Sequence, residues 1–131
     1  MMKNEVIPYE EAVAMKKLGF NEKCLACYDE KGVFGLTVMS IKKYYTNSKE
    51  DTWNCAAPLY QQAFRWFREK YNLVAEIQAP DGKDGKWNPT IHKSYGFGNY
   101  YDNDGFNSYE EAELACLRKL IEIINQNKED E

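Results

Sequence analysis

The most reactive side chains of the chain are four cysteines, two of which have the spacing of a metal or redox pair. Cys24 and Cys27 are separated by two residues, as in half a zinc site or a dithiol motif. A zinc site needs two more ligands, and only Cys55, Cys116 and His92 are available, none in a second close pair. We therefore interpret the cysteines as buried reduced thiols and predict no metal and no cofactor. A metal or redox role stays open as the alternative.

An acidic loop late in the sequence overlays part of a calcium-binding loop. Asp102, Asp104, Gly105 and Glu111 fall at positions 3, 5, 6 and 12 of an EF-hand. Tyr100 stands where the first carboxylate ligand is required, and a strand-like segment enters where the motif needs a helix. Glu111 also fits the capping box of the helix that follows. A turn leading into a capped helix is the preferred interpretation, and a calcium site is the alternative.

Histidine-based catalysis would depend on His92, because it is the single histidine. It lies on the more polar face of a predicted strand, with Ser94 on the same side. General acid–base catalysis needs an oriented partner for the imidazole, and none is identifiable. The sequence has no nucleophile elbow, phosphate-binding glycine loop or paired-histidine motif. We interpret the chain as non-enzymatic, with a small hydrolase or transferase that uses His92 as an alternative.

Residues 94–107 are rich in Tyr, Gly and Asn, the mixture that binding loops use to gain contact area at low entropy cost. The segment either completes the core or forms a binding surface, and both readings stay open. Two arginines on the polar face of a central helix are a second, weaker candidate, for binding an anion or a partner. The predicted binding residues are Tyr95, Phe97, Tyr100, Tyr101, Arg65 and Arg68.

The composition of the chain limits which partners it can bind and in which compartment it is expected. The chain has 131 residues, enough for one domain with a single core, and a net charge of −4. This acidity makes nucleic acid an unlikely partner, because phosphate binding needs clustered Lys and Arg. No run approaches the roughly 20 apolar residues of a membrane span, and the first residues lack a signal-peptide pattern. We therefore predict a cytoplasmic protein without membrane contact; the sequence does not indicate its oligomeric state.

The first half of the chain is predicted to begin with a helix from Pro8 to Leu18. Pro8 suits the first helical position, and Gly19 suits a left-handed ending that folds Phe20 back onto Met15. A hairpin follows, with strands at 25–29 and 33–39 around a turn that contains Gly32. The polar segment 42–52 shows no periodicity and is expected to be a loop, and 53–56 adds a short third strand.

A strongly amphipathic helix is predicted to begin at Pro58 and to end at Asn72. Stepping 100° per residue confines its apolar side chains to about 160° of arc, so they face the core. The members of this arc are Leu59, Tyr60, Ala63, Phe64, Trp66, Phe67 and Tyr71. Arg65 and Arg68 lie on the opposite side.

Alternating strands are predicted at 73–79 and 87–95, followed by a short strand at 97–101. Pro89 places the second of these at a sheet edge or a bulge. Ser108 and Glu111 form a capping box at the start of the last helix, and the charged tail 126–131 is expected to fray. The order helix, two or three strands, helix, two or three strands, helix predicts one α+β domain over 1–131, with an antiparallel sheet covered by three helices.

Two stretches, APLYQQAFRWFREKY at 57–71 and SYEEAELACLRKLIEII at 108–124, carry a resemblance over most of the chain. With Ile7–Glu10, they look like a group of small uncharacterised proteins encoded by bacteriophages and mobile elements of gut bacteria. The group has no established activity, so the resemblance implies a context rather than a mechanism.

Gly85–Trp87 through Tyr109–Ala112 also resembles the three-strand-plus-helix DNA-binding domain of ethylene-response factors and some phage integrases. That resemblance implies a nucleic-acid-associated protein. The departure lies in charge, because residues 73–107 carry three Lys, no Arg and five acidic residues. The leading hypothesis is therefore an accessory module that binds another protein, with nucleic-acid association as its alternative.

Overall fold

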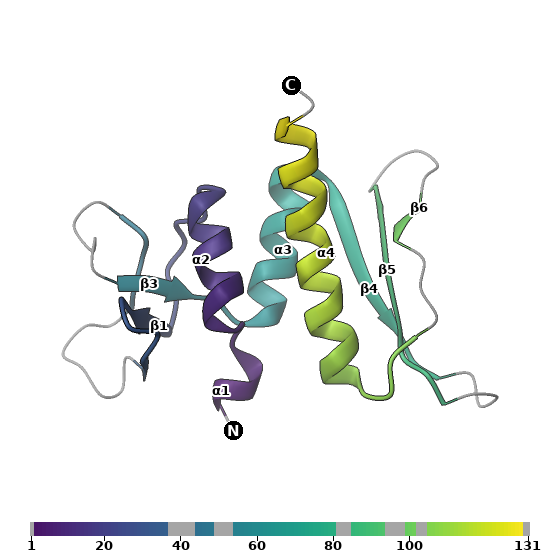
Figure 1. The fold of residues 1–131 in the computed structure, drawn as a ribbon, viewed down its shortest axis with the longest axis horizontal. Coiled ribbons are helices and arrows are strands. Elements are labelled where there is room, and N and C mark those ends of the chain that lie inside the picture. Colours follow the sequence, from purple (N-terminus) through teal and green to yellow (C-terminus); the bar gives the residue numbers. More distant parts are fainter. Residues whose placement is uncertain are drawn as a thin grey trace. The chain divides into compact units, whose positions relative to one another are not determined.

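The computed structural model describes residues 2–36, 44–48, 54–80, 85–93, 99–101 and 105–129. It confirms the predicted α+β class with antiparallel strands (Figure 1). The strands form two sheets where one was predicted, and a short helix over Met2–Glu5 precedes the predicted order of elements. The chain divides into two compact units, Met1–Ala63 and Phe64–Glu131. The elements are α1 (Met2–Glu5), α2 (Tyr9–Lys17), β1 (Ala26–Asp29), β2 (Phe34–Leu36), β3 (Asn54–Ala57), α3 (Tyr60–Tyr71), β4 (Leu73–Gln78), β5 (Asn88–Lys93), β6 (Asn99–Tyr101) and α4 (Tyr109–Glu129).

The first unit contains a three-stranded antiparallel sheet in the order β2-β1-β3. The predicted hairpin joins β1 to β2, and Gly32 in its turn has a φ of 82°. The Asp29 carboxylate accepts hydrogen bonds from the backbone N–H groups of Lys31 and Val33, at 2.8 and 2.9 Å. This turn chemistry sets the register in which Tyr28 lies opposite Phe34.

Helix α2 ends as its sequence predicts and begins one residue later than expected. Pro8 is the N-cap, with an extended backbone, rather than the first helical residue. Gly19 has a φ of 98°, and its N–H and that of Phe20 donate to the carbonyls of Lys16 and Met15, each at 3.0 Å. These two bonds define a Schellman ending, which places the Phe20 side chain in the core.

The second unit contains a meander, a three-stranded antiparallel sheet in the order β4-β5-β6. Pro89 was predicted to mark an edge strand or a bulge. The edge is wrong, because β5 is the central strand and Pro89 pairs with Ile77 of β4. Within the described residues, β5 pairs with β6 through Ile91 and His92, which follow the proline. None of these described hydrogen bonds requires the backbone N–H that Pro89 lacks. The register shift lies between Ile91 and His92 instead.

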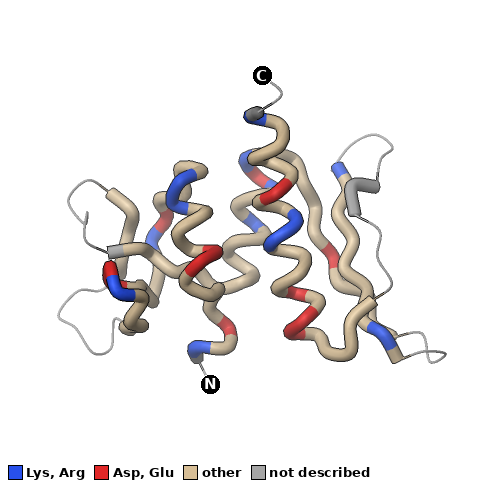
Figure 2. The backbone as a smooth tube through the Cα atoms, in the orientation of Figure 1, with Lys and Arg blue, Asp and Glu red and all other residues tan. Residues whose placement is uncertain are grey.

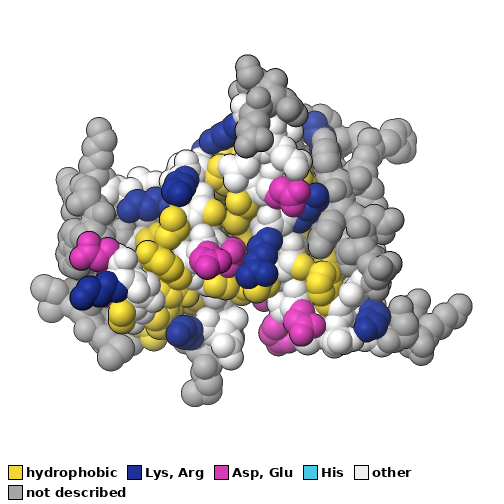
Figure 3. Space-filling view, viewed as in Figure 1, with side chains coloured by type: hydrophobic (Ala, Val, Ile, Leu, Met, Phe, Trp, Pro, Cys, Tyr) yellow, Lys and Arg dark blue, Asp and Glu magenta, His cyan; other side chains and the backbone are white. Residues whose placement is uncertain are grey.

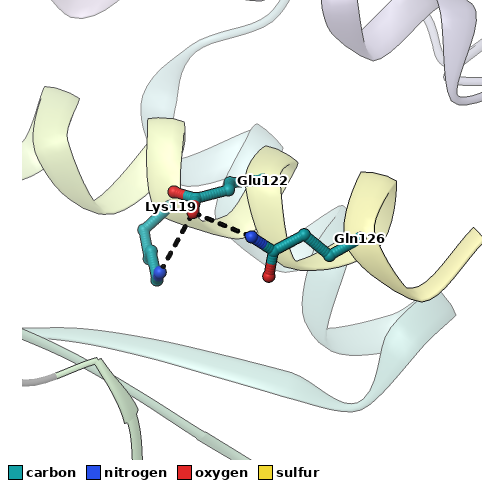
Figure 4. Close-up of polar contacts among 3 residues, drawn as sticks. All are labelled: Lys119, Glu122 and Gln126. Carbon is teal, nitrogen blue, oxygen red and sulfur yellow. Dashed lines mark hydrogen bonds and ion pairs between the residues drawn. The ribbon is translucent and has the colours of Figure 1, made fainter. Parts of the chain in front are cut away.

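Helix α4 packs against β4 and β5 and buries one side, including Cys116, Leu117 and Leu120. The Ser108 hydroxyl accepts the backbone N–H of Glu111 at 3.2 Å, which confirms Ser108 as the predicted cap. The helix continues to Glu129, into the segment predicted to fray. On its exposed side Lys119 and Gln126 both contact the Glu122 carboxylate, at 3.4 and 3.1 Å (Figure 4).

Helix α3 has the predicted amphipathic pattern, and the division between the two compact units falls within it. Of the predicted arc, Tyr60, Ala63, Phe64, Trp66 and Phe67 are buried, whereas Tyr71 and Leu59, which precedes the helix, are half-buried. Asn72 follows the helix with a φ of 58°, which confirms it as the terminator.

Candidate functional site

The clearest cluster of half-buried aromatic side chains lies in the second unit, where the chain passes from the sheet into α4. Trp87 and Phe106 form an isolated antiparallel bridge, in which each backbone N–H donates to the other's carbonyl at 2.8 Å. Residues directly opposite in such a bridge project their side chains to the same face. Both side chains are only half-buried.

Tyr109, the first residue of α4, brings a third ring to this place. Its ring centroid lies 5.3 Å from that of Trp87, with an angle of 84° between the ring planes. Such an edge-to-face pair adds about 0.5–1.5 kcal/mol beyond its area burial. Tyr109 is also half-buried. We call Trp87, Phe106 and Tyr109 the aromatic cluster.

A glycine holds the backbone beside the aromatic cluster in a tight conformation. Gly105 has a φ of 91°, and a Cβ placed there would meet the Cβ of Lys86 at 2.7 Å and the Oδ1 of Asn88 at 2.9 Å. No other residue fits this position without a backbone shift. The Lys86 ammonium also donates to the Oδ1 of Asn107, which joins the two chain segments that carry Trp87 and Phe106.

The charge beside the aromatic cluster is mixed, with two carboxylates at the start of α4 and the Lys86 ammonium, which is bonded to Asn107. Glu110 and Glu111, both exposed, follow Tyr109 in the first turn of α4, while Arg118 and Lys119 lie farther along the helix (Figure 2). In the space-filling view, acidic side chains at the lower end of α4 lie beside exposed hydrophobic ones (Figure 3). Aromatic rings and carboxylates therefore share this end of the second unit.

The predicted binding residues fall partly outside the described part of the chain. Tyr95 and Phe97 lie outside the described residues. Tyr100 and Tyr101 belong to β6 by backbone, and their side chains are outside what the structure describes. Their role in binding stays a prediction.

Arg65 and Arg68 are exposed on α3, on the side opposite its buried arc. Their position confirms the helix pattern, and their role in binding also stays a prediction.

His92 is half-buried in β5, opposite Val74 of β4 and Asn99 of β6. Glu76 is the diagonal neighbour on the same face, because it pairs with Thr90. This face of the sheet carries polar side chains, as the sequence predicts, whereas Ile91 on the opposite face is fully buried. A catalytic role for His92 stays a prediction.

All four cysteines are buried and unbonded to one another, as predicted. Burial raises the pKa of the Cys24 thiol to about 12, and the Glu22 carboxylate contributes to the rise. Burial likewise raises the pKa of Cys116 to about 12, with a contribution from Glu113. A thiol with a raised pKa is a poor nucleophile and a poor metal ligand. Among the described residues, no three His, Cys, Asp or Glu side chains are grouped so that they could hold a metal ion.

The calcium-loop pattern is only partly visible. Asp102 and Asp104 lie outside the described residues. Gly105 has the left-handed backbone of a turn, and Glu111 is exposed with its N–H bonded to the cap residue Ser108. The described part agrees with a turn leading into a capped helix.

A second exposed feature, in the first unit, was not predicted. Cys24 and Tyr45 form an antiparallel bridge with two 2.8 Å backbone hydrogen bonds, and both side chains are buried. Leu25 and Tyr44 are therefore turned outward, with 49% and 44% of their surfaces exposed. The Lys23 ammonium lies 4.6 Å from the centroid of the Tyr44 ring. The polar sequence of 42–52, which predicts a loop, does not indicate this pairing.

The aromatic cluster itself was only partly foreseen. Phe106 belongs to the Tyr/Gly/Asn-rich segment, but Trp87 and Tyr109, in the predicted strand 87–95 and at the start of the last helix, are not among the predicted binding residues. The signal that could have identified Trp87 and Tyr109 is their position in the sequence. Each begins a strand or helix directly after a segment rich in Gly, Asp and Asn, and side chains next to such loops are often incompletely buried.

Comparison of the chain with protein-family models, with curated proteins and with solved structures gives no match in any of the three. Within the described ranges, no helix combines the length and the apolar character needed to cross a bilayer.

Proposed function

We propose that this chain is a non-enzymatic module that binds another protein through the aromatic cluster of Trp87, Phe106 and Tyr109. The observation that carries the proposal is the gathering of three half-buried rings on a tightly fixed backbone. Trp and Tyr are the side chains that most often dominate the free energy of binding at protein interfaces. A rigid backbone beneath them lowers the entropy lost on binding.

The local charge supports a protein partner over a nucleic acid. Glu110 and Glu111 lie next to the rings and would repel phosphates, and Lys86 supplies a single positive charge against them. Nucleic-acid sites instead surround their aromatic side chains with several Lys and Arg. The bacteriophage or mobile-element context is proposed from the sequence resemblance alone. An accessory protein of such an element that acts in the cytoplasm fits both parts of the proposal.

Affinity capture with matched variants tests the proposal. The full chain, Tyr109→Leu and the control Tyr44→Leu are each used to capture proteins from a lysate of the cells that make the protein. Tyr44 is a suitable control because it is a tyrosine that is more exposed than Tyr109 and belongs to the other compact unit. We expect the same partner with the wild type and with Tyr44→Leu, and at least about a fivefold loss with Tyr109→Leu, the loss of a typical interface contact.

Circular dichroism of each variant shows whether it is folded. A partner retained equally by a folded Tyr109→Leu variant, or the absence of any partner specific to the wild type, contradicts the proposal.

A further inference from the structure

We infer that the partner segment bound at the aromatic cluster is basic, and that a Lys or Arg side chain of the partner packs into the corner between the rings of Trp87 and Tyr109. The inference rests on the proposed function and specifies the chemistry of the partner. Its evidence is the ring geometry and the charge of the first turn of α4.

The ring geometry provides a place for a cation. In a pair of rings at 84°, the edge of one ring points at the face of the other, and the two ring faces form a right-angled corner. The face of an aromatic ring is its negative side, so a cation near two such faces is attracted by both. Phe106 projects from the same face of the bridge as Trp87 and adds apolar surface for the stem of a long side chain.

The charge beside the corner favours a cation over an acidic side chain, because the two carboxylates of Glu110 and Glu111 outnumber the ammonium of Lys86, which is bonded to Asn107. Glu110 and Glu111 are exposed within one helical turn of Tyr109, a distance comparable with the roughly 8 Å screening length at physiological ionic strength. The basic residues of α4, Arg118 and Lys119, lie more than two turns farther along the helix. A basic segment therefore meets complementary charge at the rings.

Peptide titrations of the ¹⁵N-labelled full chain, followed by NMR, test the inference. The probes are a glycine–serine peptide with two arginines, its two-lysine counterpart and a matched peptide with two citrullines, which keep the shape of arginine without its charge. The indole N–H signal of Trp87 is assigned with the variant Trp87→Phe. We expect the arginine and lysine peptides to shift the Trp87 signal, and the citrulline peptide to leave it unchanged.

Charge variants sharpen the test. Replacing Glu110 and Glu111 by Gln keeps the cap geometry and should weaken binding of the arginine peptide about two- to fivefold, an effect that added salt should remove. Tyr109→Leu should weaken it by a similar factor, as for a cation–π contact at an exposed site. Glu122→Gln, which removes one negative charge farther along α4, should leave the affinity unchanged.

Two results overturn the inference. One is a Trp87 signal that fails to move with the cationic peptides or that moves equally with the citrulline peptide. The other is an equal loss of affinity for Glu122→Gln and for the Glu110/Glu111 variant. Either result leaves the protein-binding proposal to the capture experiment, in which a partner that depends on Tyr109 but presents no basic segment would separate the two.

Discussion

The hydroxyl of Tyr28 donates a buried hydrogen bond of 2.9 Å to the backbone carbonyl of Ile7. The bond connects β1 with the segment that leads into α2, across twenty-one residues of sequence. Because the Ile7 carbonyl is fully buried, it has no access to water if the hydroxyl is removed.

Tyr28→Phe is therefore expected to lower the free energy of unfolding by about 1–3 kcal/mol, the cost of leaving a buried acceptor unsatisfied. Urea denaturation followed by circular dichroism measures the change. Tyr9→Phe is the matched control, because the Tyr9 hydroxyl makes only a long, exposed bond of 3.4 Å to the Glu30 carbonyl. Equal effects of the two substitutions would contradict a special role for the Tyr28 hydroxyl.

Gly105→Ala should destabilise the chain more than Gly85→Ala. Both glycines have a positive φ, at 91° and 68°, so both substitutions carry the strain of a left-handed alanine. Only at Gly105 would the new Cβ meet other atoms, at 2.7 Å from Lys86 and 2.9 Å from Asn88. We expect about 1 kcal/mol for Gly85→Ala and at least about 1–3 kcal/mol more for Gly105→Ala, by chemical denaturation. Equal losses would show that Lys86 and the Asn88 side chain move aside at no measurable cost.

Ser108→Ala is expected to cost about 0.5–2 kcal/mol, because the hydroxyl satisfies the backbone N–H of Glu111 at the start of α4. Ser108→Asp should retain most of the stability, since a carboxylate accepts the same bond and favours the helix N-terminus. Thermal unfolding of the three proteins compares them directly. An alanine variant as stable as the wild type would indicate that water replaces the cap.

Stability should fall in alkaline solution because of the buried thiols. The pKa values of Cys24 and Cys116 are raised in the folded state from 9.0 to about 12. Their contribution to the free energy of unfolding is therefore fully present below pH 9. It is lost as the pH rises from 9 toward 12, because in this range the unfolded chain releases the two protons and the folded chain keeps them. Each thiol adds a slope of about 1.4 kcal/mol per pH unit within that window.

Urea denaturation between pH 8 and pH 11 measures the slope. The double variant Cys24→Ala and Cys116→Ala serves as the comparison, because it removes both thiols with a raised pKa. The packing that it loses lowers stability by an amount that does not depend on pH. A flatter decline in the variant is expected. Parallel declines in the two proteins would assign the alkaline loss to other groups, such as Tyr28, whose pKa is also raised by burial.

Features that depend on neighbouring residues were predictable from the sequence. The ending of α2 follows from Gly19 and Phe20, and the cap of α4 from Ser108, because each device is complete within a few residues. The buried arc of α3 follows from helical geometry alone.

Features that depend on distant pairing were not predictable. The position of β5 between two strands depends on which strands meet, which its own sequence does not indicate. The Cys24–Tyr45 bridge and the half-burial of Trp87 also depend on segments far apart in sequence. Periodicity carries no information on such contacts.

The two sheets differ in how their strands follow one another along the chain. In β4-β5-β6 every neighbouring pair is consecutive in sequence, whereas in β2-β1-β3 the outer strand β3 returns to β1, with Ala57 opposite Ala26. Closing that longer loop loses more chain entropy before any ladder bond compensates. During folding we therefore expect the meander to form early and the β1–β3 ladder to form late, so that substitutions in β3 mainly speed unfolding while those in β4 and β5 slow folding.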